Sequence, residues 1–174
     1  HDLAIHWRLG PGFAPSRERP RFRTFAAPDG AALTFAWTED PAWTAEVAES
    51  EWSPAYGASV PAWVLRHRAR VLLPAEFTVA LSPGERENAT LERLAGGEPA
   101  VYRYCDGTDA LLILFHDGAG PWEWEGWESD AAFLCFGRHP GEQWLLAPHS
   151  ARLRFQGREV RGPIPPASAL AALE

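Results

Sequence analysis

The stretch AWVLRHRARVLL, residues 62–73, decides the fold class because its residue pattern is that of a long β-strand. It is rich in branched residues, has an aromatic residue near its start, and carries arginine at alternate positions. On an extended strand, Arg66, Arg68 and Arg70 therefore lie on one face, and His67 lies on the other.

Shorter runs of the same kind fill most of the remaining chain and are separated by turns rich in Gly, Pro and Asp. No window of helical length carries a clean 3.6-residue apolar stripe, apart from the end of the chain. The sequence therefore predicts an all-β fold, an antiparallel β-sandwich of roughly ten or more strands. The other predicted strands are 3–9, 21–27, 31–38, 44–50, 76–82, 100–105, 110–116, 131–138, 143–148 and 151–157.

Two segments do not follow the strand pattern. ATLERLAGGEPA (89–100) has residues typical of either a short helix or a loop, and nothing in it decides between the two. The terminal PASALAALE (166–174) predicts one or two exposed helical turns.

The length of 174 residues fits one domain, so we expect a single β-sandwich over residues 1–174. The chain opens on HDLAIHWRL, a strand-like stretch with neither an initiator Met nor a signal peptide. We therefore expect this chain to be part of a longer protein.

Composition argues against two classes of partner. The net charge of −7 is opposite to the basic footprint of nucleic-acid binding, and no stretch approaches the ~18 apolar residues of a membrane helix. The two cysteines, Cys105 and Cys135, both lie in strand-like runs. We interpret them as buried free thiols, with a single bridge as the alternative.

The sequence offers no catalytic signature. Neither cysteine lies in a Cys-His pattern, and no Gly-x-Ser-x-Gly motif occurs. The six histidines include no His-x-His or His-x-x-x-His pair. His116 with Asp117 is the strongest metal candidate, but a solvated turn is the favoured interpretation of the pair. We predict no metal site and no cofactor.

Arginine stripes are the first of two candidate binding features. Guanidinium groups bind carboxylates and sulfates through paired hydrogen bonds, so the face that carries Arg66 and Arg68 predicts a site for an acidic polysaccharide. The alternative is that the stripes are solvated faces of antiparallel strands, neutralised by Glu and Asp. Similar stripes are formed by Arg17, Arg19, Arg21 and Arg23, and by Arg152 and Arg154.

The second feature is the tryptophan ladder in PWEWEGWESD (121–130). On a strand, Trp122 and Trp124 lie on one face and Glu123 and Glu125 on the other. Exposed indole rings stack on sugars, whereas the plain interpretation of this alternation is a tryptophan face in the core.

The segment EWSPAYG (51–57), which precedes the long strand, raises the same question of sugar platform or sheet corner. Pro54 and Gly57 favour a sharp turn into the strand. We expect Tyr56 to pack over that corner, with its hydroxyl bonded to a backbone group.

The string EWSPAYGASVPAWVLRHRARVLLPAEFTVALSP (51–83) resembles a segment of the C-terminal β-sandwich of heparinase II/III-like proteins. The opening HDLAIHWRLGPG is similar to their Trp-His-Leu-x-Pro stretch, although Arg8 stands in place of the His. SDAAFLCFG and ARLRFQGREV look like the closing strands of the family. The residues that match the pattern of the first string are Ser53, Tyr56, Gly57, Leu73, Pro74, Thr78, Leu81 and Pro83.

The resemblance implies a bacterial polysaccharide lyase in which an α-helical toroid precedes β-sandwich layers. Such lyases cleave uronate-containing chains by β-elimination, with a Tyr or His as the base. The family's catalytic Tyr lies in the toroid. Its sandwich His and zinc ligands come from Gly-His-x-His-x-Asp and Ala-His-Asn segments, which this chain lacks.

The expectation is therefore a non-catalytic C-terminal β-sandwich of a periplasmic or secreted lyase, with no catalytic and no metal residue of its own. Its partners would be the upstream toroid and a uronate-containing polysaccharide. The alternative is a free-standing carbohydrate-binding module for acidic glycans that uses Trp122, Trp124, Arg66 and Arg68. Among the tyrosines, Tyr56 is expected in a turn, and Tyr102 and Tyr104 flank Arg103 without a nearby His, so this chain alone is not expected to catalyse the reaction.

Overall fold

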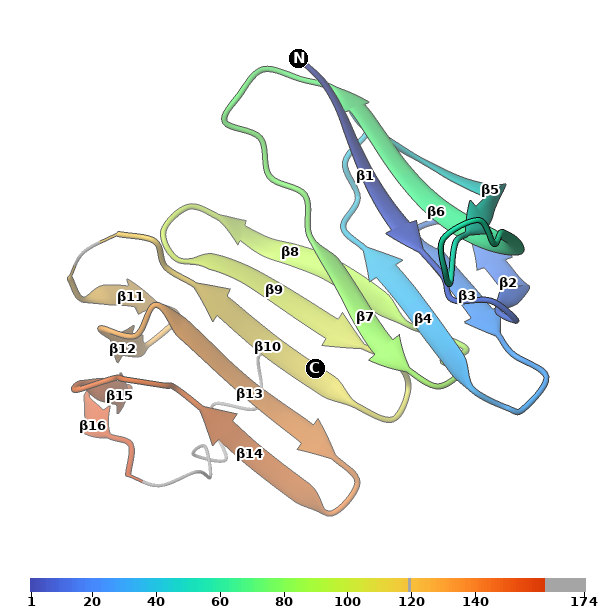
Figure 1. The fold of residues 1–174 in the computed structure, drawn as a ribbon. Coiled ribbons are helices and arrows are strands. Elements are labelled where there is room, and N and C mark those ends of the chain that lie inside the picture. Colours follow the sequence, from blue (N-terminus) through green and yellow to red (C-terminus); the bar gives the residue numbers. More distant parts are fainter. Residues whose placement is uncertain (119, 162–174) are drawn as a thin grey trace. The chain divides into compact units, whose positions relative to one another are not determined.

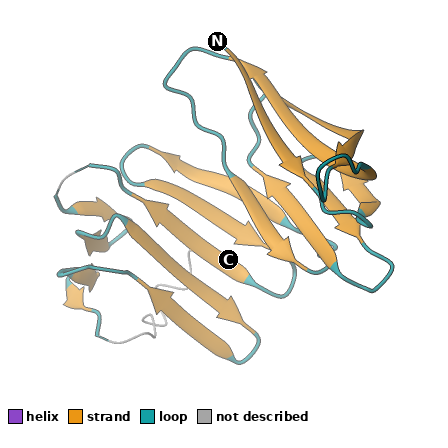
Figure 2. Ribbon diagram, viewed as in Figure 1, coloured by secondary structure: helices purple, strands orange, loops and turns teal. Residues whose placement is uncertain are grey.

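The computed structural model describes residues 1–118 and 120–161, and within them the chain is all-β (Figures 1 and 2). Sixteen strands form four antiparallel sheets, and none of the described residues is helical. This confirms the predicted fold class. No helix in this part of the chain is long and apolar enough to cross a membrane.

The chain divides into two compact units, which are described separately: unit 1, His1–Ala89, and unit 2, Thr90–Glu174. Each contains two sheets with a hydrophobic cluster. The expectation of one domain over residues 1–174 stays a prediction.

Unit 1 is a sandwich of a three-stranded and a four-stranded sheet. The first sheet, called sheet A here, has the order β1-β6-β5, with β1 Asp2–Arg8, β6 Val60–Arg70 and β5 Trp43–Trp52. The second has the order β2-β3-β4-β7, with β2 Ala14–Arg19, β3 Phe22–Ala26, β4 Ala32–Trp37 and β7 Val79–Pro83.

The core of unit 1 is built from residues of both sheets. Leu65 of β6 belongs to the same buried cluster as Phe25 of β3, and Phe35 and Trp37 of β4. Alternation along β6 explains this arrangement: Leu65, His67 and Ala69 are buried, and the arginines between them face away.

Unit 2 repeats the two-sheet plan. Its larger sheet has the order β14-β13-β10-β9-β8, with β8 Thr90–Gly96, β9 Ala100–Cys105, β10 Ala110–Phe115, β13 Phe133–His139 and β14 Glu142–Leu146. The smaller sheet has the order β11-β12-β15-β16, with β11 Trp122–Trp124, β12 Trp127–Ser129, β15 Leu153–Phe155 and β16 Arg158–Glu159.

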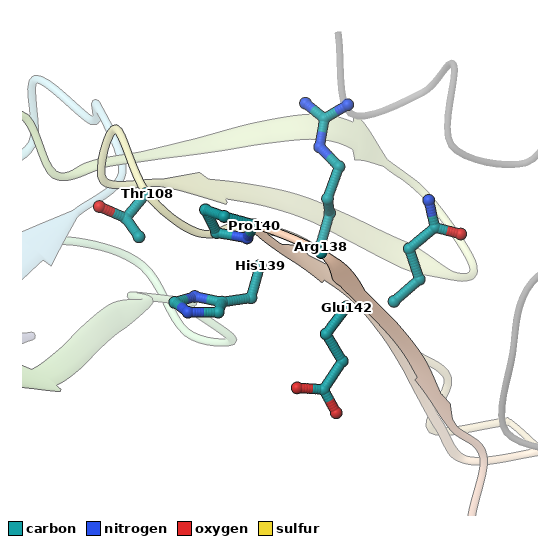
Figure 3. A pocket seen from close by; sticks show the side chains of 7 residues that line it. Thr108, Arg138, His139, Pro140 and Glu142 are labelled. Carbon is teal, nitrogen blue, oxygen red and sulfur yellow. The ribbon is translucent and has the colours of Figure 1, made fainter.

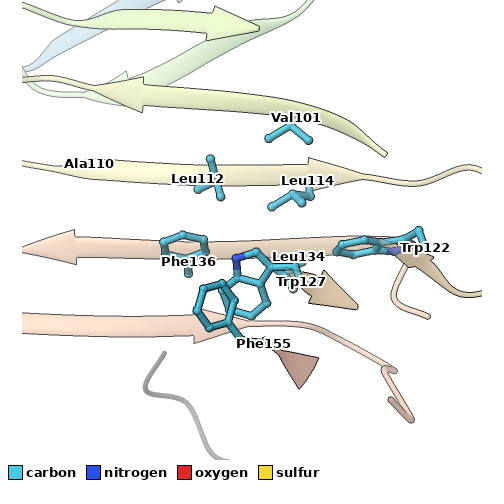
Figure 4. Close-up of a cluster of buried hydrophobic side chains, with 9 residues drawn as sticks. All are labelled: Val101, Ala110, Leu112, Leu114, Trp122, Trp127, Leu134, Phe136 and Phe155. Atoms are coloured by element: carbon cyan, nitrogen blue, oxygen red, sulfur yellow. The ribbon is translucent and has the colours of Figure 1, made fainter. Parts of the chain in front are cut away.

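Aromatic residues of the smaller sheet of unit 2 pack against leucines and Phe136 of the larger one (Figure 4). The Trp127 ring stacks on Phe136 with ring centroids 5.3 Å apart, and it also contacts Phe155 at 4.9 Å. These large rings bury the apolar area that holds two short sheets together.

The undecided segment 89–100 contains strand β8, which pairs with β9 and is neither a helix nor a loop over Thr90–Gly96. The predicted helical turns at 166–174 lie outside the described residues.

The run of alternate arginines from residue 17 to residue 23 is not one stripe, which corrects the sequence interpretation. Arg17 and Arg19 belong to β2, whereas Arg21 lies in the turn, with φ 62°, and Arg23 belongs to β3. The turn reverses the chain, so the four side chains do not share a single extended face.

Candidate carbohydrate-binding face

The predicted arginine stripe of β6 forms one face of sheet A, the face turned away from the core. Because β6 is paired without a register shift to β1 and β5, strand alternation places Arg66, Arg68 and Arg70 on the same side as His6 and Arg8 of β1. We call these five residues the arginine face. Arg8, Arg68 and Arg70 are exposed, and Arg66 is half-buried.

A groove with a volume of about 610 Å³ lies on this face. Arg68 belongs to β6, the middle strand of sheet A. The residues paired with it on the two neighbouring strands, Ala4 of β1 and Thr44 of β5, have small side chains. Short neighbours on both sides leave the guanidinium accessible across the sheet. The groove is also lined by Asp2, His6 and Arg70.

The positive charge of this face is only partly neutralised. Arg66 lies 3.8 Å from Glu46, and Arg70 lies 3.9 Å from Asp2, both at the limit of an ion pair. Within the described part of the chain, the Arg68 guanidinium has no ion-pair partner. The chain thus carries a local cationic surface although its net charge is −7.

The other arginines flagged by the sequence are mostly paired with carboxylates. Arg17 binds Glu87 at 2.9 Å, and Arg21 binds Glu39 at 3.1 Å. Arg23 and Arg152 also form ion pairs, with Glu18 and Glu128 respectively. For these residues the interpretation as neutralised surface applies.

The tryptophan ladder lies in unit 2 and belongs to its core. Trp122 is 5% exposed, and its indole N–H donates to the carbonyl oxygen of Ala131 at 2.7 Å. Trp124 is half-buried and packs against the same cluster. Because Trp122 is buried, neither face of its ring is free to stack on a sugar. Its burial contributes to the stability of the sandwich instead.

Tyr56 does not pack over the sheet corner, which corrects the sequence expectation. It lies in the β5–β6 connection, and its side chain is fully exposed. Gly57, with φ 75°, does form the expected turn, but this turn directs Tyr56 into solvent.

The remaining tyrosines are inaccessible as bases. Tyr102 and Tyr104 are 2% and 4% exposed, and the Tyr104 hydroxyl donates to the Asp106 carboxylate at 3.2 Å. A proton acceptor must reach its substrate, so neither side chain is placed for β-elimination.

Both cysteines are free, as expected. Cys105 pairs with Ala110 and Cys135 with Ile113 of β10, which runs between their strands. Their backbones are therefore about 10 Å apart across the sheet and about 10 Å apart along it, beyond the reach of a disulfide. Burial raises the pKa of the Cys135 thiol to about 12 and also raises the pKa of Cys105. Neither is an activated nucleophile.

The sequence pointed to His116 and Asp117 but not to their neighbour Glu98. The β9–β10 hairpin brings Glu98, which precedes β9, next to His116 and Asp117, which follow β10. A Glu98 carboxylate oxygen lies 2.9 Å from His116 Nδ1, and a hydrogen bond to the Asp117 carboxylate raises the pKa of Glu98. The pairing of the start of β9 with the end of β10 is the signal that would have predicted this contact.

The three side chains of this cluster are not arranged as a metal-binding group. The described residues include no group of three or more His, Cys, Asp and Glu placed to hold a metal ion. Carboxylate oxygen and imidazole nitrogen are in direct contact, which leaves no space for an ion between them.

A second pocket, of about 460 Å³, lies at the β13–β14 hairpin of unit 2 (Figure 3). His139 and Glu142 point to one side of the hairpin and Arg138 to the other, as their paired positions require. His139 Nδ1 contacts the Asp109 carboxylate. Thr108 lines the same pocket, but no hydrogen bond joins its hydroxyl to His139 among the described residues.

No family model matches the chain, and no curated protein matches it at a significant level.

Proposed function

We propose that this chain is the non-catalytic C-terminal β-sandwich portion of a bacterial heparinase II/III-like polysaccharide lyase, and that its arginine face binds the uronate-containing polysaccharide. The family part of the proposal rests on the sequence resemblance over residues 51–83 and at the chain's start. The same resemblance implies a periplasmic or secreted protein with an α-toroid upstream.

The observation that carries the binding role is the accessible guanidinium of Arg68. It lies in a groove between small side chains and has no carboxylate partner among the described residues. An arginine that is not already neutralised retains its hydrogen-bond donors for a ligand carboxylate or sulfate. Arg66 and Arg70, whose ion pairs are long, add charge on either side.

The non-catalytic role is supported by the burial of the candidate tyrosine bases and by the raised pKa values of the cysteine thiols. Tyr102 and Tyr104 are buried, and both cysteines have raised thiol pKa values. The proposal therefore assigns the elimination chemistry to another part of the parent protein and assigns substrate contact to sheet A.

Binding of an acidic polysaccharide tests the proposal directly. Calorimetry with a polyuronate and with a neutral glucan should give binding of the polyuronate alone. Arg68→Ala should weaken this binding by about tenfold, which is the loss of roughly one charge-assisted contact of 1–2 kcal/mol. Arg66→Ala should weaken it further.

Arg154→Ala is the matched control, because it removes an exposed arginine from β15 in unit 2 and changes the net charge equally. Equal losses with Arg68→Ala and Arg154→Ala would point to non-specific charge attraction and would contradict the proposal. So would equal binding of the neutral glucan.

A free-standing module for acidic glycans is the second candidate, favoured by the same arginine face. The two differ in the size of the native protein. An antibody against this chain should detect a product several times heavier than 19.2 kDa if a toroid precedes it. A native product of this size would leave the free module as the function.

A further inference from the structure

The β5–β6 hairpin ends in an exposed aromatic tip. Trp52, the last residue of β5, is 39% exposed, and Tyr56 in the connecting turn is fully exposed. Exposed aromatic rings offer flat apolar faces to a ligand, so two of them at one hairpin end make this tip a candidate binding surface.

The turn holds Tyr56 outward. The Ser53 hydroxyl lies within hydrogen-bond distance of the carbonyl oxygens of Ala55, at 3.1 Å, and Ala58, at 2.8 Å. The Ala58 amide donates to the Ala55 carbonyl at 3.1 Å, and Gly57 adopts a positive φ. These bonds close a compact turn that projects Tyr56 from its apex.

Trp52 of the tip lies on the same side of sheet A as the arginine face, with the buried Ala62 and Val64 of β6 between the two. Trp52 is paired with Val60, and the register of β5 with β6 continues unbroken to the pair of Glu46 and Arg66. Residues an even number of positions apart share a face, so Trp52 lies on the side of the sheet that carries Arg66. Val60 and Arg66 are six positions apart on β6, a span of about 20 Å along the strand.

We propose that Trp52 and Tyr56 form an aromatic subsite that extends the arginine face, so that the ligand is a long polyuronate chain lying along β6. This inference rests on the proposed function. The arginines hold carboxylates at one end, and the aromatic rings stack on the apolar faces of sugar rings at the other. A ligand that reaches both ends must contain several consecutive sugars.

The test compares a uronate disaccharide with an octasaccharide of the same uronate, by calorimetry on the intact chain. We expect the octasaccharide to bind more tightly, and Tyr56→Ala and Trp52→Ala each to weaken it by about tenfold. Both variants should leave disaccharide affinity unchanged, because a disaccharide held by arginines does not reach the tip. Tyr56→Phe should retain octasaccharide affinity, since the ring makes the contact.

Leu72→Ser is the matched control, because Leu72 is also exposed, at 87%, but lies outside sheet A. Tyr56 contributes no buried surface, so its replacement does not threaten the fold, whereas Trp52 is partly buried and its variant needs a folding check by circular dichroism.

The outcomes separate this inference from the proposed function. If Arg68→Ala weakens both ligands and the tip variants change neither, the aromatic subsite is wrong while the arginine site stands. If neither ligand binds, or if Arg68→Ala has no effect, the proposed function fails and the extension fails with it.

Discussion

His67 is a fully buried histidine in the core of unit 1, between arginines that face the other way. Its ring packs against the rings of Trp37 and Phe77, with centroid-to-centroid distances of 4.8 Å and 4.7 Å. Neither ring nitrogen has a hydrogen-bond partner in the structure. Burial, with a smaller contribution from the charge of Arg23, lowers the pKa of His67 to about 4. The folded protein therefore holds this side chain neutral.

Acid should destabilise the protein through His67. The unfolded chain binds the proton near pH 6.5, whereas the folded chain binds it only near pH 4. The unfolded state thus holds more protons in this window, and the free energy of unfolding falls as the pH falls. The loss reaches about 3 kcal/mol below pH 4. Urea unfolding between pH 7.5 and 3.5 measures it.

His67→Phe keeps an aromatic ring in the core and removes the titration. The difference in unfolding free energy between this variant and the parent should therefore change with pH between 6.5 and 4. Carboxylates titrate in both proteins, so their contribution cancels. A difference that stays constant over this range would show that His67 does not couple protonation to folding.

Single residues were only partly predictable from the sequence. Alternation correctly placed Arg66 and His67 on opposite faces of one strand. It also allowed Trp122 to be core, which its burial bears out. The prediction that Tyr56 packs over the sheet corner was wrong, because a turn residue does not follow the alternation of a strand. The direction of its side chain depends on hydrogen bonds such as those of Ser53, which the sequence does not reveal.

Strand β13 runs through the larger sheet of unit 2 and carries a glycine, Gly137, just past its midpoint. A Cβ added at Gly137 would lie 2.7 Å from Leu111 Cδ2 on β10 and 2.7 Å from Trp144 on β14. Neighbours on both sides of the strand thus fill the space above this residue. Gly137 lets two large side chains meet across the strand.

Gly137→Ala should lower the free energy of unfolding by about 1–3 kcal/mol, because the added methyl group overpacks the sheet. Denaturant titration measures this change. Gly97→Ala is the control in the same unit, since no atom lies within 4 Å of an added Cβ there and its φ is not positive. A tolerated Gly137→Ala would mean that Trp144 is free to move aside.

Elements with strong alternation and clear turns were predictable, as β6 and the β9–β10 hairpin illustrate. Strand β8 was not, because TLERLAG consists mainly of good helix formers. Pairing with β9, including the register shift between Arg93 and Ala95, overrides that local preference. Pairing partners distant in sequence are not visible in a local pattern.

At the scale of the whole molecule, an acidic chain carries a cationic face on one of its sheets. The stripe itself was visible in the sequence. The groove was not, because it depends on Ala4 and Thr44, which the sheet places beside Arg68 from strands far along the chain.

Salt should weaken polyuronate binding strongly. The arginine face is exposed, so ions screen its attraction for carboxylates, and the Debye length falls from about 10 Å at 0.1 M salt to about 3 Å at 1 M. We expect affinity to fall at least tenfold over that range, measured by calorimetry, with a shallower slope for Arg68→Ala. Affinity independent of salt would place the binding on uncharged surface.

The outer strand β2 bears on how this protein behaves in concentrated solution. All six of its residues are exposed, it pairs on one side only, with β3, and its register shifts between Pro15 and Arg17. An open strand edge invites another chain to add to the sheet. The proline, the irregular register and the charged Arg17, Glu18 and Arg19 oppose such pairing. The arginines of β2 thus help to keep separate copies of the protein from aggregating edge to edge.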